Sequence, residues 1–337
     1  MSYKISIEGG ESFAVSSEED TLLRGALRAG IGLPHECSVG GCGACRFELT
    51  AGEMETLWPD APGLSDRDRK RGKRLACQSR PLGDCSIKAR CAEEYRPVVA
   101  TRRQTVRLLE RRLVARDMLE LTFQAPVAAE FRPGQYALLY PPGAEGARAY
   151  SMSNLANEAG LWQFIVRRVP GGRGSNALFD RVHIGDELVL DGPYGHAYLR
   201  DDNEREVVCI AGGSGLAPML SIARQVLGQA DALGRPAPRR VRFFDGARTI
   251  ADLCGEALLA DMPQALLSYL PVLSEPSDSW SGAVGFVHQA VAKTLPQPFA
   301  QYDFYFAGPP PMIEAIQTLL MIEHKVPFQQ IHFDRFV

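Results

Sequence analysis

Four cysteines constrain this chain more than any other feature. The segment Cys37-Ser-Val-Gly-Gly-Cys42-Gly-Ala-Cys45 has the spacing C-x4-C-x2-C, and Cys77 supplies a distant fourth sulfur. Four thiolates with this spacing are typical ligands of a [2Fe–2S] cluster. The glycines of the loop allow it to wrap tightly, so that backbone N–H groups point at the negatively charged sulfides. We therefore predict a cluster held by these four residues.

A structural zinc site is the alternative for the same thiols. Zinc sites favour paired C-x2-C knuckles, and Cys77 has no second cysteine or histidine beside it. The spacing therefore favours the cluster over zinc or free thiols. The other four cysteines, Cys85, Cys91, Cys209 and Cys254, share no spacing. An intracellular chain keeps such thiols reduced, so a disulfide framework is the weaker interpretation.

Length and composition narrow the class of protein. A chain of 337 residues is too long for one ordinary core, which predicts two or three domains. The net charge of −3 argues against a chain built to coat nucleic acid. No apolar run approaches the length of a membrane span, and the first residues lack the apolar core of a secretory signal. We therefore expect a cytoplasmic protein without a membrane partner.

The pattern of strands and turns changes twice along the chain. Residues 1–97 predict a small α+β domain, with strands near 3–7 and 12–15 and a helix over 21–29 that follows Glu18, Glu19 and Asp20. Residues 98–203 carry short strands between recurring Gly and Pro turns, which predicts a β-barrel or sandwich. Residues 204–337 alternate apolar strands with helices, which indicates a parallel sheet covered on both faces.

Arg148-Ala-Tyr150-Ser151 is the candidate flavin motif. It is flanked by FRPGQY at 131–136 before it, and by PGGRGSNAL at 170–178 and GPYG at 192–195 after it. This ordered set resembles the ferredoxin–NADP reductase-like flavin domain, just as the first domain resembles the plant-type ferredoxins. We expect Arg148 to neutralise a flavin pyrophosphate, Tyr150 to stack on the flavin ring and Ser151 to bond near its reactive nitrogen.

Two further residues of that stretch, Gly172 and Ser175, are expected to offer backbone donors to the flavin phosphates. For the isolated tetrapeptide, a solvated Arg148 and a core Tyr150 are the alternative. The flavin is FAD or FMN. A ferredoxin placed before the flavin domain resembles the FAD-containing aromatic oxygenase reductases, whereas FMN-containing phthalate-type reductases carry the ferredoxin at the other end.

Two glycine-rich turns predict a pyridine nucleotide site. The strand at 207–211 runs into Gly212, Gly213, Ser214 and Gly215, and a helix follows, as in sites that bind a pyrophosphate. The turn does not match G-x-G-x-x-G, but it resembles the G-G-[ST]-G-[IL]-A-P segment of the reductases. Gly308 and Pro309 belong to a second segment, in which Ala307 stands where those relatives carry cysteine.

Coenzyme choice rests on Asp245, which follows the next strand. A carboxylate there would accept hydrogen bonds from the adenine ribose and repel a 2′-phosphate, which favours NADH over NADPH. Arg248 nearby would instead favour NADPH, and a simple turn residue is the alternative role for Asp245.

By resemblance, an aromatic residue near the C-terminus covers the flavin. Phe336 is that candidate, with Tyr150 and Ser151 as the other catalytic residues, and an edge-strand core role is its alternative.

Together the three segments resemble the reductase components of bacterial multicomponent oxygenases, with the toluene/o-xylene monooxygenase reductases as the nearest group. The resemblance implies a β-grasp-like [2Fe–2S] ferredoxin, a six-stranded antiparallel β-barrel that binds FAD and an α/β domain that binds NADH. It also implies electron transfer to a Rieske-type ferredoxin of a diiron aromatic monooxygenase. Direct delivery to a phenol hydroxylase or a Rieske dioxygenase is the alternative.

The stretch from Arg67 to Arg74 is strongly basic and lies just before Cys77. We hypothesise that it steers an acidic acceptor toward the cluster, with a solvated surface as the alternative.

For the whole chain, the alternative function is a redox-sensing or zinc-stabilised binding module without turnover. A brown-orange colour that bleaches with NADH would distinguish the reductase from that module.

Overall fold

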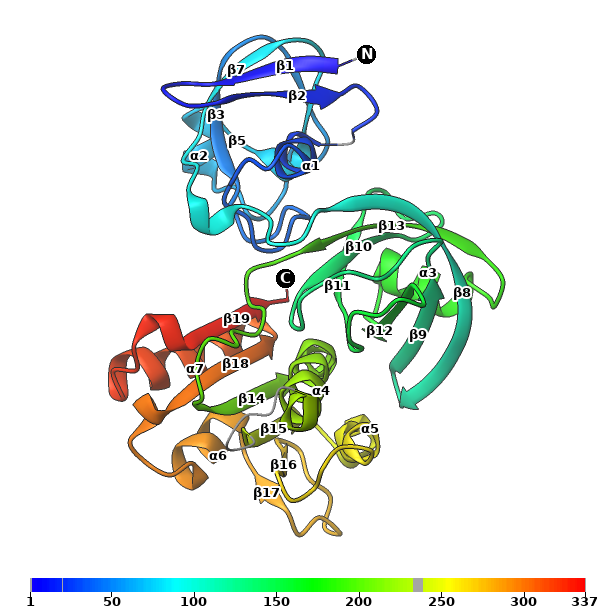
Figure 1. Ribbon diagram of the computed structural model, residues 1–337, viewed down its shortest axis with the longest axis vertical. Helices are drawn as coiled ribbons and strands as arrows, with labels where there is room; N and C mark the ends of the chain where they lie inside the picture. Colours follow the sequence, from blue (N-terminus) through cyan, green and yellow to red (C-terminus); the bar gives the residue numbers. More distant parts are fainter. Residues whose placement is uncertain (1, 20, 233–238, 337) are drawn as a thin grey trace. The chain divides into compact units, whose positions relative to one another are not determined.

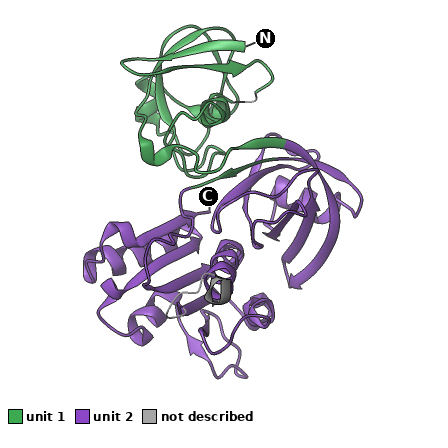
Figure 2. Ribbon diagram, in the orientation of Figure 1, with its two compact units in different colours: residues 1–103, 191–195, 337 green, residues 104–190, 196–336 purple. Residues whose placement is uncertain are grey.

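The computed structural model describes residues 2–19, 21–232 and 239–336, and it divides into two compact units (Figures 1 and 2). Unit 1 comprises residues 1–103, 191–195 and 337, and unit 2 comprises residues 104–190 and 196–336. Asp20, which we predicted at the start of the first helix, lies outside the described residues. No helix within the described ranges is both long and apolar enough to span a bilayer.

Unit 1 contains a five-stranded mixed sheet with the order β2-β1-β7-β3-β5. Its strands are β1 (Ser2–Ile7), β2 (Ser12–Ser16), β3 (Arg46–Ala51), β5 (Lys73–Leu75) and β7 (Cys85–Lys88). Helix α1 (Leu22–Arg28) begins after Thr21, whose hydroxyl accepts a hydrogen bond from the Arg24 amide. A Cβ added at Gly25 would lie 2.7 Å from Val15, so α1 packs closely on β2. The two predicted strands and the predicted helix are therefore confirmed.

Shorter elements of unit 1 carry the loops around the cysteines. They are β4 (Met54–Thr56), α2 (Asp66–Lys70), the 3-10 turn η1 (Ala76–Gln78), β6 (Ser79–Pro81) and the 3-10 turn η2 (Glu93–Tyr95). Strands β4 and β6 form a separate two-stranded sheet. Cys77 lies on η1, and Cys37, Cys42 and Cys45 lie on the irregular segment between α1 and β3.

The first part of unit 2 holds most of a six-stranded antiparallel sheet with the order β11-β10-β13-β8-β9-β12, whose residues 102–103 and 191–194 are counted with unit 1. Its elements are β8 (Arg102–Ala115), β9 (Met118–Gln124), β10 (Tyr136–Tyr140), β11 (Arg148–Ser151), β12 (Leu161–Arg167), α3 (Arg173–Asp180) and β13 (Glu187–Tyr194). A bridge pairs Met152, next to β11, with Phe164 of β12, so the two edge strands meet and the sheet closes. Buried side chains, including Phe123 and Trp162, fill its interior. The barrel is therefore the correct alternative, and not the sandwich.

The second part of unit 2 is a six-stranded parallel sheet with the order β17-β16-β15-β14-β18-β19. Its strands are β14 (Glu206–Gly212), β15 (Val241–Ala247), β16 (Leu267–Leu273), β17 (Ala283–Val284), β18 (Tyr302–Gly308) and β19 (Ile331–Arg335). The main helices are α4 (Leu216–Ala232), α5 (Gly255–Leu259), α6 (Val287–Thr294) and α7 (Pro310–Gln317), which continues as a π-helical turn at Thr318–Glu323.

Strand β14 is buried on both faces, as its continuous apolar run predicts. Val207 and Cys209 belong to the core that includes α4 and α5, whereas Val208 and Ile210 belong to the core that includes α6 and α7. Cys209 is fully buried, which fits its predicted role as a small hydrophobic residue. Helices therefore cover both faces of this sheet (Figure 1).

Candidate functional site

The four predicted cluster ligands lie in two pairs within unit 1. The Sγ atoms of Cys45 and Cys77 are 3.3 Å apart, although the two residues are far apart in sequence. The Cys37 amide donates to the Cys42 Sγ at 3.5 Å, and the Gly41 and Cys42 amides each donate to the Cys37 Sγ at 3.3 Å. The loop therefore directs backbone N–H groups at sulfur, as its glycines predict.

The arrangement in pairs distinguishes two irons from one zinc ion. A zinc ion requires ligands that converge on a single point, and no three Cys, His, Asp or Glu side chains do so among the residues described. Two irons joined by sulfides require two thiolates each. The pairs Cys37 with Cys42 and Cys45 with Cys77 fit that requirement, so the donor set suits a [2Fe–2S] cluster.

Each thiol pair favours a thiolate on one of its members: the pKa is lowered for Cys37 and Cys45, and it is raised for Cys42 and Cys77 by the shared hydrogen bond and by burial. A hydrogen bond from the Cys42 thiol, together with backbone N–H donors, lowers the pKa of Cys37 to about 6 against the opposing effect of burial. The thiol of Cys85, in contrast, donates to the Glu53 and Gly83 carbonyls. Burial raises its pKa, and its thiol packs at the turn around Gly52, so Cys85 has a structural role.

The predicted flavin motif lies on β11 in unit 2. The Arg148 guanidinium donates to the carbonyls of Glu145 and Ala147, at 3.0 and 2.9 Å. These bonds hold the cation in place without neutralising it, so it can still bind a phosphate. Tyr150 packs at the edge of the barrel core, and burial raises the pKa of its phenol to about 12. Ser151 is buried and pairs with Tyr136 across the sheet.

Helix α3 carries the other two predicted flavin residues. Gly172 immediately precedes the helix, and the Ser175 hydroxyl accepts a hydrogen bond from the Val169 amide at 3.1 Å. A Cβ on Gly172 would lie 2.8 Å from that hydroxyl and 2.9 Å from the Val169 side chain. The turn before α3 is therefore closed by packing, and the Gly172 amide already donates to the Val169 carbonyl at 2.9 Å. The flavin roles of Gly172 and Ser175 remain predictions.

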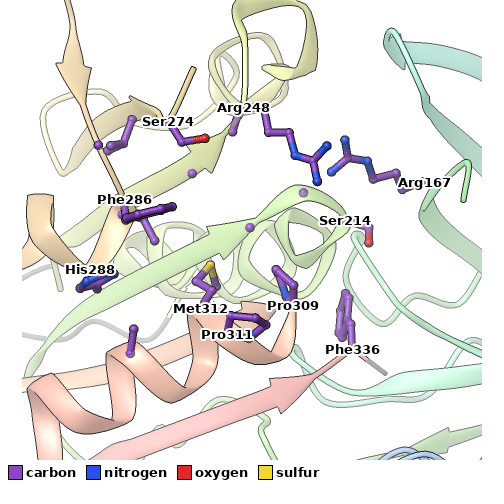
Figure 3. Close-up of a pocket in the computed structure, with 18 residues that line it drawn as sticks. Arg167, Ser214, Arg248, Ser274, Phe286, His288, Pro309, Pro311, Met312 and Phe336 are labelled. Carbon is purple, nitrogen blue, oxygen red and sulfur yellow. The ribbon is translucent and has the colours of Figure 1, made fainter. Parts of the chain in front are cut away.

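A pocket of about 520 Å³ opens where the strands of the parallel sheet end (Figure 3). Ligands of parallel α/β sheets bind at this edge. Five of the predicted site residues line it: Gly212, Gly213, Ser214, Pro309 and Phe336. Residues that follow the neighbouring strands complete the wall, among them Arg248, Ser274, Phe286, His288 and Met312. The two glycine-rich turns, which are nearly a hundred residues apart in sequence, therefore meet at one site.

Gly215 and Gly308 shape this pocket without lining it. A Cβ on Gly215 would lie 1.9 Å from the Ala307 carbonyl oxygen, so only glycine fits where the two turns touch. Gly308 has a φ of 158°, and a Cβ there would lie 2.7 Å from the Met312 side chain. Gly215 is explained by the close approach of two backbones, and Gly308 by the Met312 side chain together with the Gly212 backbone, which a Cβ would meet at 3.2 Å.

Two arginines approach the mouth of the pocket from different elements. Arg167 ends β12 of the barrel, and its Nη1 would lie 3.0 Å from a Cβ on Gly213. Its Nε donates to Asp117 at 2.8 Å, which fixes the side chain. Figure 3 shows the guanidinium groups of Arg167 and Arg248 extending toward one another near Ser214. Arg167 is fixed in an ion pair with Asp117, whereas Arg248 is exposed, and both present guanidinium N–H donors of the kind that bind phosphate groups.

Asp245 does not have the position that we predicted. It lies on the same side of β15 as Phe243, facing the core around α4, and it is only 4% exposed. Its carboxylate accepts a hydrogen bond from the Tyr269 hydroxyl at 2.9 Å. Burial raises its pKa to about 6, although this hydrogen bond opposes the shift. The structure therefore contradicts contact between Asp245 and an adenine ribose in the pocket, since that carboxylate faces the opposite side of the sheet.

Phe336 forms part of the pocket wall beside Pro309 (Figure 3). Its amide donates to the Gly308 carbonyl at 3.0 Å, which ties the end of the chain to the second glycine-rich turn. Phe336 therefore lies in the parallel-sheet part of unit 2. Coverage of a flavin by the Phe336 ring remains a prediction.

Comparison with known proteins agrees with this arrangement. Three family models match in chain order: a 2Fe-2S iron-sulfur cluster binding domain at residues 5–82, an oxidoreductase FAD-binding domain at 105–198 and an oxidoreductase NAD-binding domain at 209–318. The ferredoxin–NAD(P)+ reductase CarAd of Metapseudomonas resinovorans is 40% identical, and the match covers 99% of each chain.

The chain belongs to the ferredoxin–NAD(P)+ reductase family of oxygenase systems. The ferredoxin–NAD+ reductase component of the alkene monooxygenase system of Xanthobacter autotrophicus is 39% identical, over 98% of this chain and 99% of that one. A solved structure of the ferredoxin reductase in carbazole 1,9a-dioxygenase matches all of this chain and 99% of its own with a TM-score of 0.91 and 37% identity. The reductase is therefore an oxidoreductase with [2Fe–2S], FAD and NAD domains.

Sequence reasoning missed several pocket residues of this reductase. Arg167 lies just before the predicted flavin turn. A second basic residue beside it, Arg168, was the one sign in the sequence that a positively charged site could lie there. Ser274, Phe286 and His288 follow β16 and β17 and belong to no motif that we identified. Their place in the site depends on which strands are neighbours in the sheet, and this order is not visible in the sequence.

Proposed function

We propose that this reductase takes electrons from NADH and delivers them, through FAD and the [2Fe–2S] cluster, to a Rieske-type ferredoxin of a multicomponent toluene or related aromatic monooxygenase. The observation that carries the proposal is the presence in one chain of two thiol pairs suited to two irons and a pocket formed by two glycine-rich turns at the edge of the parallel sheet. A flavin accepts a hydride and releases electrons singly, which matches a two-electron donor to a one-electron cluster.

The protein's own groups position the reactants. We propose that the turn at Gly212–Ser214 and the cation of Arg167 bind the NADH pyrophosphate. The wall formed by Pro309 and Phe336 would then orient the nicotinamide and exclude water from it. Arg148 would hold the flavin pyrophosphate through a guanidinium already oriented by backbone carbonyls. None of these steps needs a proton donor or a nucleophilic side chain.

The choice of acceptor follows from the relatives. Two relatives at 40 and 39% identity are named as ferredoxin reductases. The phenol hydroxylase P5 protein of Acinetobacter pittii is 32% identical, and the electron transfer component of an anthranilate 1,2-dioxygenase is 34% identical. This difference favours a ferredoxin as the acceptor. Direct reduction of a phenol hydroxylase or a Rieske dioxygenase is the second candidate.

An anaerobic NADH titration of the purified protein tests the first part of the proposal. We expect the flavin absorbance to bleach and the EPR signal of a reduced [2Fe–2S] cluster to appear. Protein that contains zinc, or no metal, at the four cysteines would overturn it. Adding a purified Rieske-type ferredoxin, or in parallel a phenol hydroxylase, then tests the acceptor. Reoxidation by the hydroxylase alone would favour the second candidate.

A further inference from the structure

Trp58 is an exposed aromatic side chain next to the first cysteine-bearing segment. It is 45% exposed, and its neighbour Leu57 is 37% exposed. A Cβ added at Gly40 would lie 3.1 Å from the Trp58 ring and 3.2 Å from the Gln78 side chain. Gly40 lies between Cys37 and Cys42, and Gln78 is next to Cys77. The indole therefore lies on the surface directly beside the cluster ligands.

The loop that carries Trp58 is held rigidly against the cysteine loop. The Leu57 amide donates to the Gln78 carbonyl and the Gly63 amide to the Gly40 carbonyl, both at 2.9 Å. A Cβ on Gly43 would lie 2.3 Å from the Gly63 carbonyl oxygen, so the two backbones are in contact. A large aromatic group that is fixed before binding loses little entropy when a partner covers it.

Helix α2 places three cations beside this loop. Arg69 fastens the helix to it, because its guanidinium donates to the carbonyls of Pro59 and Ala61 at 3.1 and 2.9 Å. Arg67, Lys70 and Arg71 are exposed, and their spacing of three and four residues puts them on one face of the helix. None of these three has an ion pair in the part of the chain that the structure describes.

Two other cations of the basic stretch, Arg69 and Lys73, are already in ion pairs. Arg69 pairs with Asp66, Arg46 pairs with Asp68, and Lys73 pairs with Glu48. The Arg74 guanidinium donates to the Met54 carbonyl and the Thr56 hydroxyl. Arg74 keeps its charge, but it is half-buried and held by uncharged acceptors. The steering strip that we predicted from Arg67 to Arg74 therefore reduces to three exposed cations on α2 and at its C-terminal end.

From this geometry we infer that Trp58 is the central contact of the acceptor-docking surface, and that Arg67, Lys70 and Arg71 attract an acidic Rieske-type ferredoxin to it. This inference rests on the proposed function. Exposed tryptophans in fixed positions carry a large share of the binding energy at protein interfaces. Uncompensated charges at the rim accelerate association with a partner of opposite charge. The acceptor would then meet the protein beside the ligands that hold the cluster.

The test uses full-length holoprotein and a purified acidic Rieske-type ferredoxin as the probe. For Trp58→Ala we expect the KM for the ferredoxin to rise about tenfold or more, while NADH oxidation by ferricyanide stays unchanged. Trp58→Phe should restore most of the affinity.

The triple change Arg67→Glu, Lys70→Glu and Arg71→Glu should raise the KM for the ferredoxin at low salt and remove the salt dependence of that KM. Leu82→Ala and Lys88→Glu change exposed residues elsewhere in unit 1 and should have no effect.

A second measurement avoids variants altogether. In wild-type protein, hydroxyl-radical labelling should oxidise Trp58 more slowly when the ferredoxin is present, and Leu82 at an unchanged rate. Equal labelling of Trp58 with and without the ferredoxin, or an unchanged KM in Trp58→Ala, overturns the docking surface. Wild-type protein that reduces ferricyanide but not the ferredoxin instead overturns the proposed function, and this inference with it.

Discussion

The cysteine loop of unit 1 and the nucleotide pocket of unit 2 use different chemistry to hold a redox group. In the loop, four particular side chains supply the candidate ligands, and the backbone adds N–H donors. In the pocket, two glycine-rich turns make the shape, and side chains from several strands complete it. Side-chain identity is therefore decisive in the first region, whereas close approach of backbones is decisive in the second.

Replacing one thiol should give the largest effect. In Cys77→Ser, the pair formed with Cys45 loses a soft ligand, so we expect the cluster to be lost and reduction of a protein acceptor to fall at least about a hundredfold. NADH oxidation by ferricyanide should persist, because the nucleotide pocket lies in unit 2. Iron content, EPR and parallel assays with both acceptors measure this. Cys85→Ser is the matched control, and it should keep the cluster. Loss of both activities in Cys77→Ser would mean that the two regions are not independent.

A change of backbone shape should have the next largest effect. In Gly215→Ala, the added methyl group meets the Ala307 carbonyl at 1.9 Å, so the turns must separate. We expect a loss of about 1–3 kcal/mol in the free energy of unfolding, typical of overpacking, and a rise of about tenfold or more in the KM for NADH. Gly228→Ala, at a helical position with nothing within 4 Å, is the control and should stabilise the protein by about 0.5–1 kcal/mol. Similar behaviour of the two variants would contradict the role given to close packing at Gly215.

The coenzyme preference distinguishes Asp245 from Arg248. Arg248 lines the pocket and is exposed, so Arg248→Glu would place a negative charge where a 2′-phosphate needs a positive one. We expect kcat/KM for NADPH to fall about tenfold relative to NADH, which corresponds to about 1.4 kcal/mol. Asp245→Asn should leave that ratio unchanged, because its carboxylate faces away from the pocket. A ratio that changes only in Asp245→Asn would restore our original prediction.

The smallest predicted effect is the change in the free energy of unfolding with pH. Burial raises the pKa of Asp245 from 3.8 to about 6, so the folded protein holds this proton more tightly than the unfolded chain does. The folded state should therefore lose stability as the pH rises from about 4 to about 6, by an amount on the order of 2–3 kcal/mol, and then level off. Urea unfolding of wild type and Asp245→Asn across that range measures it. A wild-type profile no steeper than that of Asp245→Asn would contradict the assignment.

The contrast also explains what could be predicted from the sequence. A thiolate ligand is a covalent property of one residue, so the spacing of Cys37, Cys42 and Cys45 predicts a cluster site without any knowledge of the fold. Apolar runs such as 207–211 predicted buried strands for a similarly local reason. Asp245 failed because its role depends on the side of β15 that it occupies. Its place two residues after the buried Phe243 already indicated the core-facing side.

Arg167 was out of reach for a different reason. It lies at the end of a barrel strand, and its partner Gly213 lies in the turn after β14. Nothing local connects the two residues, because their proximity follows from the packing of the barrel on the parallel sheet within unit 2. Trp58 and Gly40 present the same difficulty over a shorter separation in sequence. Tertiary proximity of this kind becomes predictable only once the topology is known.

The position of Arg167 has a consequence for how such chains can be recombined. A cut after the barrel, near residue 203, would remove a guanidinium from the mouth of the nucleotide pocket, because Arg167 is supplied by the preceding segment. Transplanting the last segment alone into another flavoprotein should therefore give a weak coenzyme site unless the host supplies an equivalent cation. The barrel and the nucleotide domain together form the smallest exchangeable cassette.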